Sequence, residues 1–319
     1  MKRDDRTIGK ARAARGGVAI LLLAALSVAS FPLARVTSAA RPATHSAATV
    51  TLNIGEKNFD EEFIVGDIYA LLLQKAGFKY KLHVLGSEPG PFQTAMLRGQ
   101  LDLYPEYTGT GLVGVLGVPG IANQALAFKT VKRLYEKRYH FTWLQRAPMN
   151  DTNAAAVTSA TASKYHLKTL SDLARVASQL SFIALPACQG RSDCLAGMQS
   201  AYGINFKNVT YVASTSLTTK ALVGGQADAA ELFSTSPVIK KDGLVVLADN
   251  KAKVFPADNL APVIRDPVLH KYPKIAGILN KVEKYLTTQA VIGLNAKFDL
   301  LNQDALSIAR KFLKSKHLL

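Results

Sequence analysis

Short apolar segments alternate with amphipathic ones along most of this chain, and that alternation limits what the chain can fold into. Residues 50–54 alternate like a β-strand, and the amphipathic helix that follows ends at Gly77. Residues 80–85 form a second predicted strand, 91–98 a short helix, and a third strand begins at 101–104. This order predicts an α/β domain with a largely parallel sheet.

The same alternation recurs after residue 153, so the chain contains two such units. The further predicted helices lie at 109–117, 124–140, 170–177, 193–202, 215–223, 267–287, 288–296 and 302–315, and the further strands at 141–144, 154–158, 181–185, 209–212 and 244–247. Two polar segments, 148–153 and 234–237, are predicted to cross between the units. We therefore expect lobe I to comprise residues 50–150 and 236–319 and lobe II residues 151–235, with a ligand cleft between them.

The first 40 residues have the pattern of a secretory signal peptide. A basic segment precedes the apolar run 18–29, and small residues follow at 37–40, which predicts cleavage near Ala39 or Ala40. An uncleaved anchor helix is the alternative. No cysteine follows the apolar run, so we expect no lipid modification, and residues 41–49 are predicted to be a flexible leader. The expected location is the periplasm or cell envelope.

Charge and cysteine content add two further expectations. The chain carries a net charge of +16, and residues 1–40 contribute seven basic and two acidic side chains, which leaves +11 for the remainder. Export argues against nucleic acid as a partner, and the basic residues are interpreted as a solvated surface. Cys188 and Cys194 lie six positions apart. In an oxidising compartment such a pair favours a disulfide over a metal site.

The stretch from Asp102 to Gly114 combines two tyrosines, two acids, two threonines and three glycines after a predicted strand. Its Gly-x-Gly-x-x-Gly match follows the third strand rather than the first, and the acidic residue expected at the end of the next strand is missing. We therefore expect no nucleotide cofactor, and the glycines are interpreted as places of close backbone approach. The six histidines are scattered, and no Gly-x-Ser-x-Gly or His-Glu-x-x-His motif occurs. The expectation is a protein without metal, cofactor or enzymatic activity.

Two motifs carry a resemblance to a known family. Residues 54–62, Ile-Gly-Glu-Lys-Asn-Phe-Asp-Glu-Glu, and residues 102–110, Asp-Leu-Tyr-Pro-Glu-Tyr-Thr-Gly-Thr, closely resemble those of osmoprotectant-binding proteins. These are the glycine betaine/carnitine/choline-binding subunits of ABC importers, and the similarity extends over residues 50–315. The resemblance implies a two-lobed periplasmic-binding-protein fold of type II that closes on a small solute and delivers it to an ABC permease.

The resemblance also implies a set of ligand-binding residues. Lys57 would hold a ligand carboxylate, Tyr107 would form an aromatic wall with Thr110 beside it, and Tyr104 would lie close by. Asp151 matches a ligand-facing Asp, and Arg191 matches a carboxylate-binding Arg. The alternatives for Lys57, Tyr104 and Arg191 are a surface lysine, a core tyrosine and a solvated arginine.

The sequence departs from the family where the family often has tyrosine, because Asn153, Thr219 and Asp258 stand there. Either other aromatics, such as Trp143, Phe233 or Tyr211, complete the site, or the ligand is not a quaternary amine. Asn153 and Asp258 would suit a ligand with N–H donors. The main prediction is a binding subunit for glycine betaine- or choline-like solutes. The alternatives are a binding protein or receptor for another polar amine or amino-acid-like ligand, and an exported hydrolase or transferase.

Overall fold

The computed structural model describes residues 50–319. The predicted signal peptide (1–40) and leader (41–49) lie outside the described residues. Within 50–319, every helix is too short or too polar to cross a membrane.

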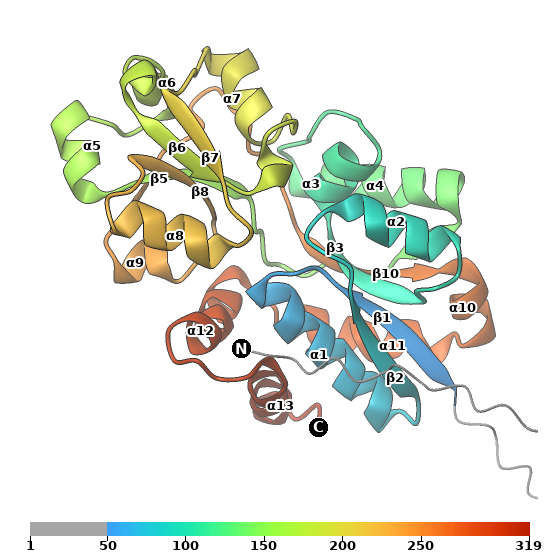
Figure 1. Ribbon diagram of the computed structural model, residues 1–319. Helices are drawn as coiled ribbons and strands as arrows, with labels where there is room; N and C mark the ends of the chain where they lie inside the picture. Colours follow the sequence, from blue (N-terminus) through green and yellow to red (C-terminus); the bar gives the residue numbers. More distant parts are fainter. Residues whose placement is uncertain (1–49) are drawn as a thin grey trace, which may run out of the picture. The chain divides into compact units, whose positions relative to one another are not determined.

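The described chain builds two five-stranded sheets of matching topology, which confirms the predicted α/β class (Figure 1). The first sheet has the order β2-β1-β3-β10-β4 and the second the order β7-β6-β8-β5-β9. In each sheet three neighbouring strands run parallel, and the next strand, β10 or β5, is antiparallel to the strands on both of its sides. The first sheet contains β1 (Thr51–Glu56), β2 (Lys79–Val84), β3 (Leu103–Tyr107), β4 (Phe141–Trp143) and β10 (Leu260–Arg265). The second contains β5 (Asn153–Val157), β6 (Ser181–Ala184), β7 (Asn208–Tyr211), β8 (Ala229–Phe233) and β9 (Val245–Val246).

Helices flank each sheet, as the alternation predicts. In the first lobe they are α1 (Asp60–Lys75), α2 (Pro89–Leu97), α3 (Thr108–Thr110), α4 (Gln124–Tyr139), α10 (Asp266–Lys271), α11 (Lys274–Glu283), α12 (Thr288–Asp299) and α13 (Ala305–Ser315). The second lobe has α5 (Ser159–Tyr165), α6 (Leu170–Ala174), α7 (Leu195–Tyr202), α8 (Thr215–Val223) and α9 (Val238–Lys241). Helix α1 packs against α11, α12 and α13 and, with β1, forms a large apolar core on one face of the first sheet. A second cluster around Trp143 and Tyr135 fills the other face.

Strand β10 and helices α5 and α9 are absent from the predicted elements, and two predicted boundaries also differ from the structure. Strand β9 pairs with β5 in the second sheet, although residues 236–319 were assigned to lobe I. The chain therefore enters the first sheet again only at β10. The single helix predicted over 267–287 is two helices, α10 and α11. Pro273 separates them, because proline has no N–H to continue a helix and restricts the residue before it.

The glycines of the 102–114 stretch serve close packing within the protein. A β-carbon on Gly109 would lie 3.0 Å from the Ala257 carbonyl oxygen, and one on Gly111 would lie 2.9 Å from the Trp143 ring. Both glycines are buried in the turn that follows β3. This agrees with the interpretation of these glycines as places of close backbone approach.

Candidate functional site

A cavity lies where strand ends of the two sheets face each other, and it contains most of the residues that the sequence singles out. Its volume is about 60 Å³. Seven of the eight predicted ligand-binding residues line it: Lys57, Tyr107, Thr110, Asp151, Asn153, Arg191 and Asp258. The sheet topology explains why these residues lie together. Strands β1 and β3 are parallel and end at the same edge of the sheet, where Lys57 follows β1 and Tyr107 ends β3.

Tyr104 is the one predicted residue that does not line this cavity. It lies three positions before Tyr107 on β3, and successive side chains of a strand point to opposite faces. Its ring is fully buried and stacks on Phe92 with centroids 5.6 Å apart. Tyr104 therefore belongs to the core behind the cavity wall.

Lys57 is buried and surrounded by acceptors from its own lobe. Its Nζ donates to Glu106 Oε1 at 2.8 Å, to Glu62 Oε1 at 3.3 Å and to the Pro105 carbonyl oxygen at 3.3 Å. Burial lowers the pKa of Lys57, but Glu106 and Glu62 together raise it above its ordinary value. The ammonium is thus charged, and protein oxygens accept from all three of its N–H groups.

Arg191 is similarly held by a carboxylate, this time from its own loop. Its Nε and Nη2 donate to the two oxygens of Asp193 at 2.7 and 2.5 Å. Burial lowers the pKa of Arg191, but Asp193 raises it above its ordinary value. Nη2 also donates to Thr110 Oγ1 at 3.3 Å, which joins the second lobe to the first across the cavity.

The remaining predicted polar residues fix the backbone around the cavity. Asp258 Oδ1 accepts from the amides of Gly109 and Thr110 at 2.5 and 3.1 Å, at the first turn of α3. Asp151 Oδ1 accepts from the Thr235 amide at 3.0 Å, and Asn153 Nδ2 donates to the Asp193 carbonyl oxygen at 3.0 Å. Burial raises the pKa of Asp258 to about 7, and the nearby Asp193 adds to the effect. The two carboxylates and the amide thus anchor loops of both lobes.

Six lining residues were not among the predicted ligand-binding residues: Phe59, Ser87, Leu185, Ala187, Glu231 and Phe233. Phe233 was named as a possible replacement aromatic, whereas Trp143 is buried in the core against Tyr135. Glu231 is the one acid in the otherwise apolar strand Ala-Ala-Glu-Leu-Phe. An acid in such a strand is a sequence signal for a residue that lines a site. Burial raises the pKa of Glu231 to about 7.

Three aromatic rings form one side of the cavity. Phe59 lies between the other two, with its centroid 6.1 Å from that of Tyr107 and 6.0 Å from that of Phe233. The Tyr107 hydroxyl donates to Glu61 Oε1 at 2.7 Å, which fixes the ring. Aromatic faces attract cations, because the ring face carries partial negative charge. This group of three rings, Phe59, Tyr107 and Phe233, is called the aromatic corner below.

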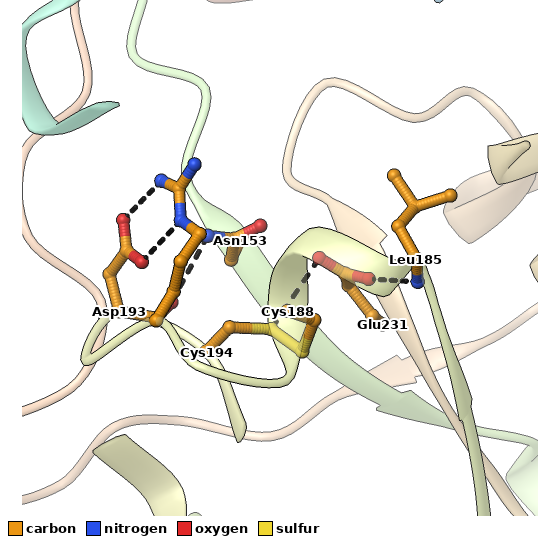
Figure 2. Close-up of a disulfide and its surroundings, with 7 residues drawn as sticks. Asn153, Leu185, Cys188, Asp193, Cys194 and Glu231 are labelled. Atoms are coloured by element: carbon orange, nitrogen blue, oxygen red, sulfur yellow. Dashed lines mark hydrogen bonds and ion pairs between the residues drawn. A yellow bond between two sulfur atoms is a disulfide. The ribbon is translucent and has the colours of Figure 1, made fainter. Parts of the chain in front are cut away.

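The disulfide predicted between Cys188 and Cys194 is present and closes the loop that carries Arg191 and Asp193 (Figure 2). Glu231 lies beside it, with Oε1 3.4 Å from Cys194 Sγ. Because the two sulfurs are bonded to each other, neither Cys188 nor Cys194 has a thiolate that could bind a metal ion.

The two matched sheets with a polar and aromatic cavity between them define a two-lobed binding protein of the type II periplasmic class. The family model described as the substrate-binding domain of ABC-type glycine betaine transport systems matches residues 50–315. The chain belongs to this family, whose members are binding proteins of ABC importers.

Known relatives of this chain agree with that assignment. A glycine-betaine-binding protein of Pseudomonas aeruginosa is 32% identical over 280 residues, which cover 84% of this chain and 89% of the relative. An ergothioneine transport permease/ergothioneine binding protein of Helicobacter pylori is 31% identical over 264 residues, which cover 82% of this chain. The match spans only 47% of that longer relative.

Solved structures give the same fold. A crystal structure of a glycine betaine/carnitine/choline ABC transporter superposes with a TM-score of 0.67 at 26% identity and covers 85% of this chain and 99% of its own. The apo structure of YehZ from Escherichia coli gives a TM-score of 0.62 at 30% identity and covers 86% of this chain and all of its own.

Proposed function

We propose that this protein captures a small quaternary amine of the glycine betaine and choline class outside the cytoplasm and presents it to an ABC permease. The aromatic corner carries the proposal, because three rings with neighbouring centroids 6.1 and 6.0 Å apart line the cavity, and aromatic rings attract a trimethylammonium group. The names of relatives with the same fold, which bind glycine betaine or carnitine, support the ligand class.

The predicted ligand-binding residues take more specific roles in this proposal. Tyr107 would contact the ligand directly, and Thr110, Asp151 and Asn153 would line the polar side of the cavity. Lys57 and Arg191 would fix neighbouring carboxylates, because each is already paired within the protein. Closure would bring the two lobes onto the ligand, as the contact between Arg191 and Thr110 suggests.

Export and the permease partner belong to the same proposal. The basic and apolar pattern of residues 1–40 supports export, and membership of a family of importer subunits supports a permease partner.

A thermal-shift titration of the purified protein tests the ligand class. A ligand that binds only the folded state at 100 times its Kd adds about 2.7 kcal/mol, which corresponds to roughly 4–5 °C for a chain of this size. We expect choline or glycine betaine to produce such a shift and sorbitol, which has no charge, to produce none. If no quaternary amine raises the melting temperature, the proposal is wrong.

A further inference from the structure

The charges around the cavity are unbalanced. The two cations that line it are each neutralised within the protein, Lys57 by Glu62 and Glu106, and Arg191 by Asp193. Three more buried carboxylates line the cavity, namely Asp151, Glu231 and Asp258. Among the ion pairs of residues 50–319, none joins these three to a lysine or arginine. The lining therefore has more carboxyl groups than partner cations, and a bound cation would favour the charged form of these groups, which burial disfavours.

Glu231 is the carboxylate of the three whose bonding is least complete. Its Oε2 accepts from the Leu185 amide at 2.6 Å. Its Oε1 lies 3.4 Å from Cys194 Sγ, but a sulfur in a disulfide carries no hydrogen to donate (Figure 2). The side chain is only 4% exposed. A buried carboxylate oxygen without a donor is costly, and a ligand that brings a hydroxyl or N–H group would remove that cost.

The other two carboxyl groups accept more hydrogen bonds from the protein than Glu231 does. Both oxygens of Asp258 accept from the Gly109–Thr110 turn, and Asp151 Oδ1 accepts from the Thr235 amide. Asp151 Oδ1 also accepts from the Ser234 hydroxyl at 3.4 Å, so Glu231, with one hydrogen bond from an N–H donor, is the least bonded of the three, and its Oε1 is an open acceptor. A carboxylate on the ligand would face these carboxyl groups and find both lining cations already paired, because Lys57 pairs with Glu62 and Glu106 and Arg191 pairs with Asp193.

We infer that, within the quaternary-amine class, this cavity selects ligands with a net positive charge and a hydrogen-bond donor, and that Glu231 is the residue that recognises the donor. The inference rests on the proposed function. In such a complex the trimethylammonium group contacts the aromatic corner, and the donor of the ligand reaches Glu231 Oε1 from the same cavity. Cation–π attraction and a charge-assisted hydrogen bond then act on opposite ends of one small molecule.

Choline and glycine betaine form a matched pair of probes, because they share the trimethylammonium group and differ in a hydroxymethyl or a carboxylate end. Isothermal titration of the full chain with each should give a Kd at least tenfold lower for choline. The variant Glu231→Gln keeps an acceptor for the Leu185 amide but removes the charge. It should weaken choline binding by about tenfold or more and leave betaine binding unchanged or tighter, which reduces the preference.

Glu283→Gln is the matched control. Glu283 is also a buried glutamate and accepts from the Tyr69 hydroxyl at 2.7 Å in the first lobe, away from the cavity lining. This variant should leave both dissociation constants unchanged. Equal binding of the two probes by the wild type, or an unchanged ratio in Glu231→Gln, would overturn the inference while the proposed function stands. If neither probe binds, both the proposed function and the inference fail. The ratio in the wild-type protein does not depend on the folding of any variant.

Discussion

At the scale of single residues, the aromatic corner is assembled from positions that are far apart in the sequence. Phe59 follows β1 of the first sheet, and Phe233 ends β8 of the second, yet their rings stack at 17° and 6.0 Å. The family motif indicated Tyr107 but not Phe59, although Phe59 lies inside the quoted stretch 54–62. Sequence alone does not separate a phenylalanine that faces a cavity from one that packs in a core.

Replacement of Phe233 by leucine tests the aromatic corner. The substitution keeps an apolar side chain but removes the ring face, so quaternary-amine affinity should fall by about tenfold, near 1.4 kcal/mol. Calorimetric titration with choline and betaine measures the loss. The control is Phe206→Leu, because Phe206 also stacks on a phenylalanine, Phe182, at 4.5 Å within the second lobe. A control variant that loses as much affinity would contradict a specific role for Phe233.

At the scale of elements, the loop from Cys188 to Cys194 connects the second sheet to the cavity. It carries Arg191, which bonds Asp193 of the same loop and Thr110 of the first lobe. Asn153 of β5 donates to the Asp193 carbonyl oxygen and so ties the loop to its own sheet. The spacing of the cysteines predicted the disulfide, but the bonds that tie the loop to Asn153 and Thr110 join residues 40 and 81 positions apart, beyond what local spacing encodes.

The double variant Cys188→Ser/Cys194→Ser should lower the free energy of unfolding by about 2 kcal/mol, because the closed loop is short. It should also weaken ligand binding, since the loop that holds Arg191 and Asp193 becomes freer. Urea unfolding and calorimetric titration measure the two effects. Dithiothreitol should reproduce them in the wild type and leave the double variant unchanged; a wild type that binds equally well after reduction would contradict the second effect.

At the scale of the whole molecule, buried carboxyl groups are distributed over both lobes. Burial raises the pKa of Glu62, Glu231 and Asp258 to about 7 and that of Glu283 to about 8. In the unfolded chain these groups have their ordinary values of 4.5 for Glu and 3.8 for Asp. Between those values and pH 7 to 8, the folded state therefore holds protons that the unfolded state has released.

This difference fixes the sign of the pH dependence. A carboxyl whose folded pKa is raised stabilises the fold fully only below its unfolded pKa, and that contribution is lost as pH rises through the folded pKa. The unliganded protein should therefore lose stability between about pH 4.5 and 8, by at least about 1.4 kcal/mol, the value of one pKa unit. Urea unfolding at pH 5 and pH 8 measures the loss, and Glu283→Gln should reduce it. A free energy of unfolding that rises with pH would contradict this prediction.

The alternation of strands and helices, the family motifs and the spacing of the two cysteines can be seen in the amino-acid sequence, because each of these is a local property of the chain. From them follow the α/β class, the two lobes and seven of the residues that line the cavity. The folded chain places Glu106, 49 positions away, against Lys57, and it places Glu231 against the disulfide; neither contact is visible in the sequence. Both contacts depend on which strands become neighbours in a sheet, and that order is set by packing over the whole domain rather than by any local pattern.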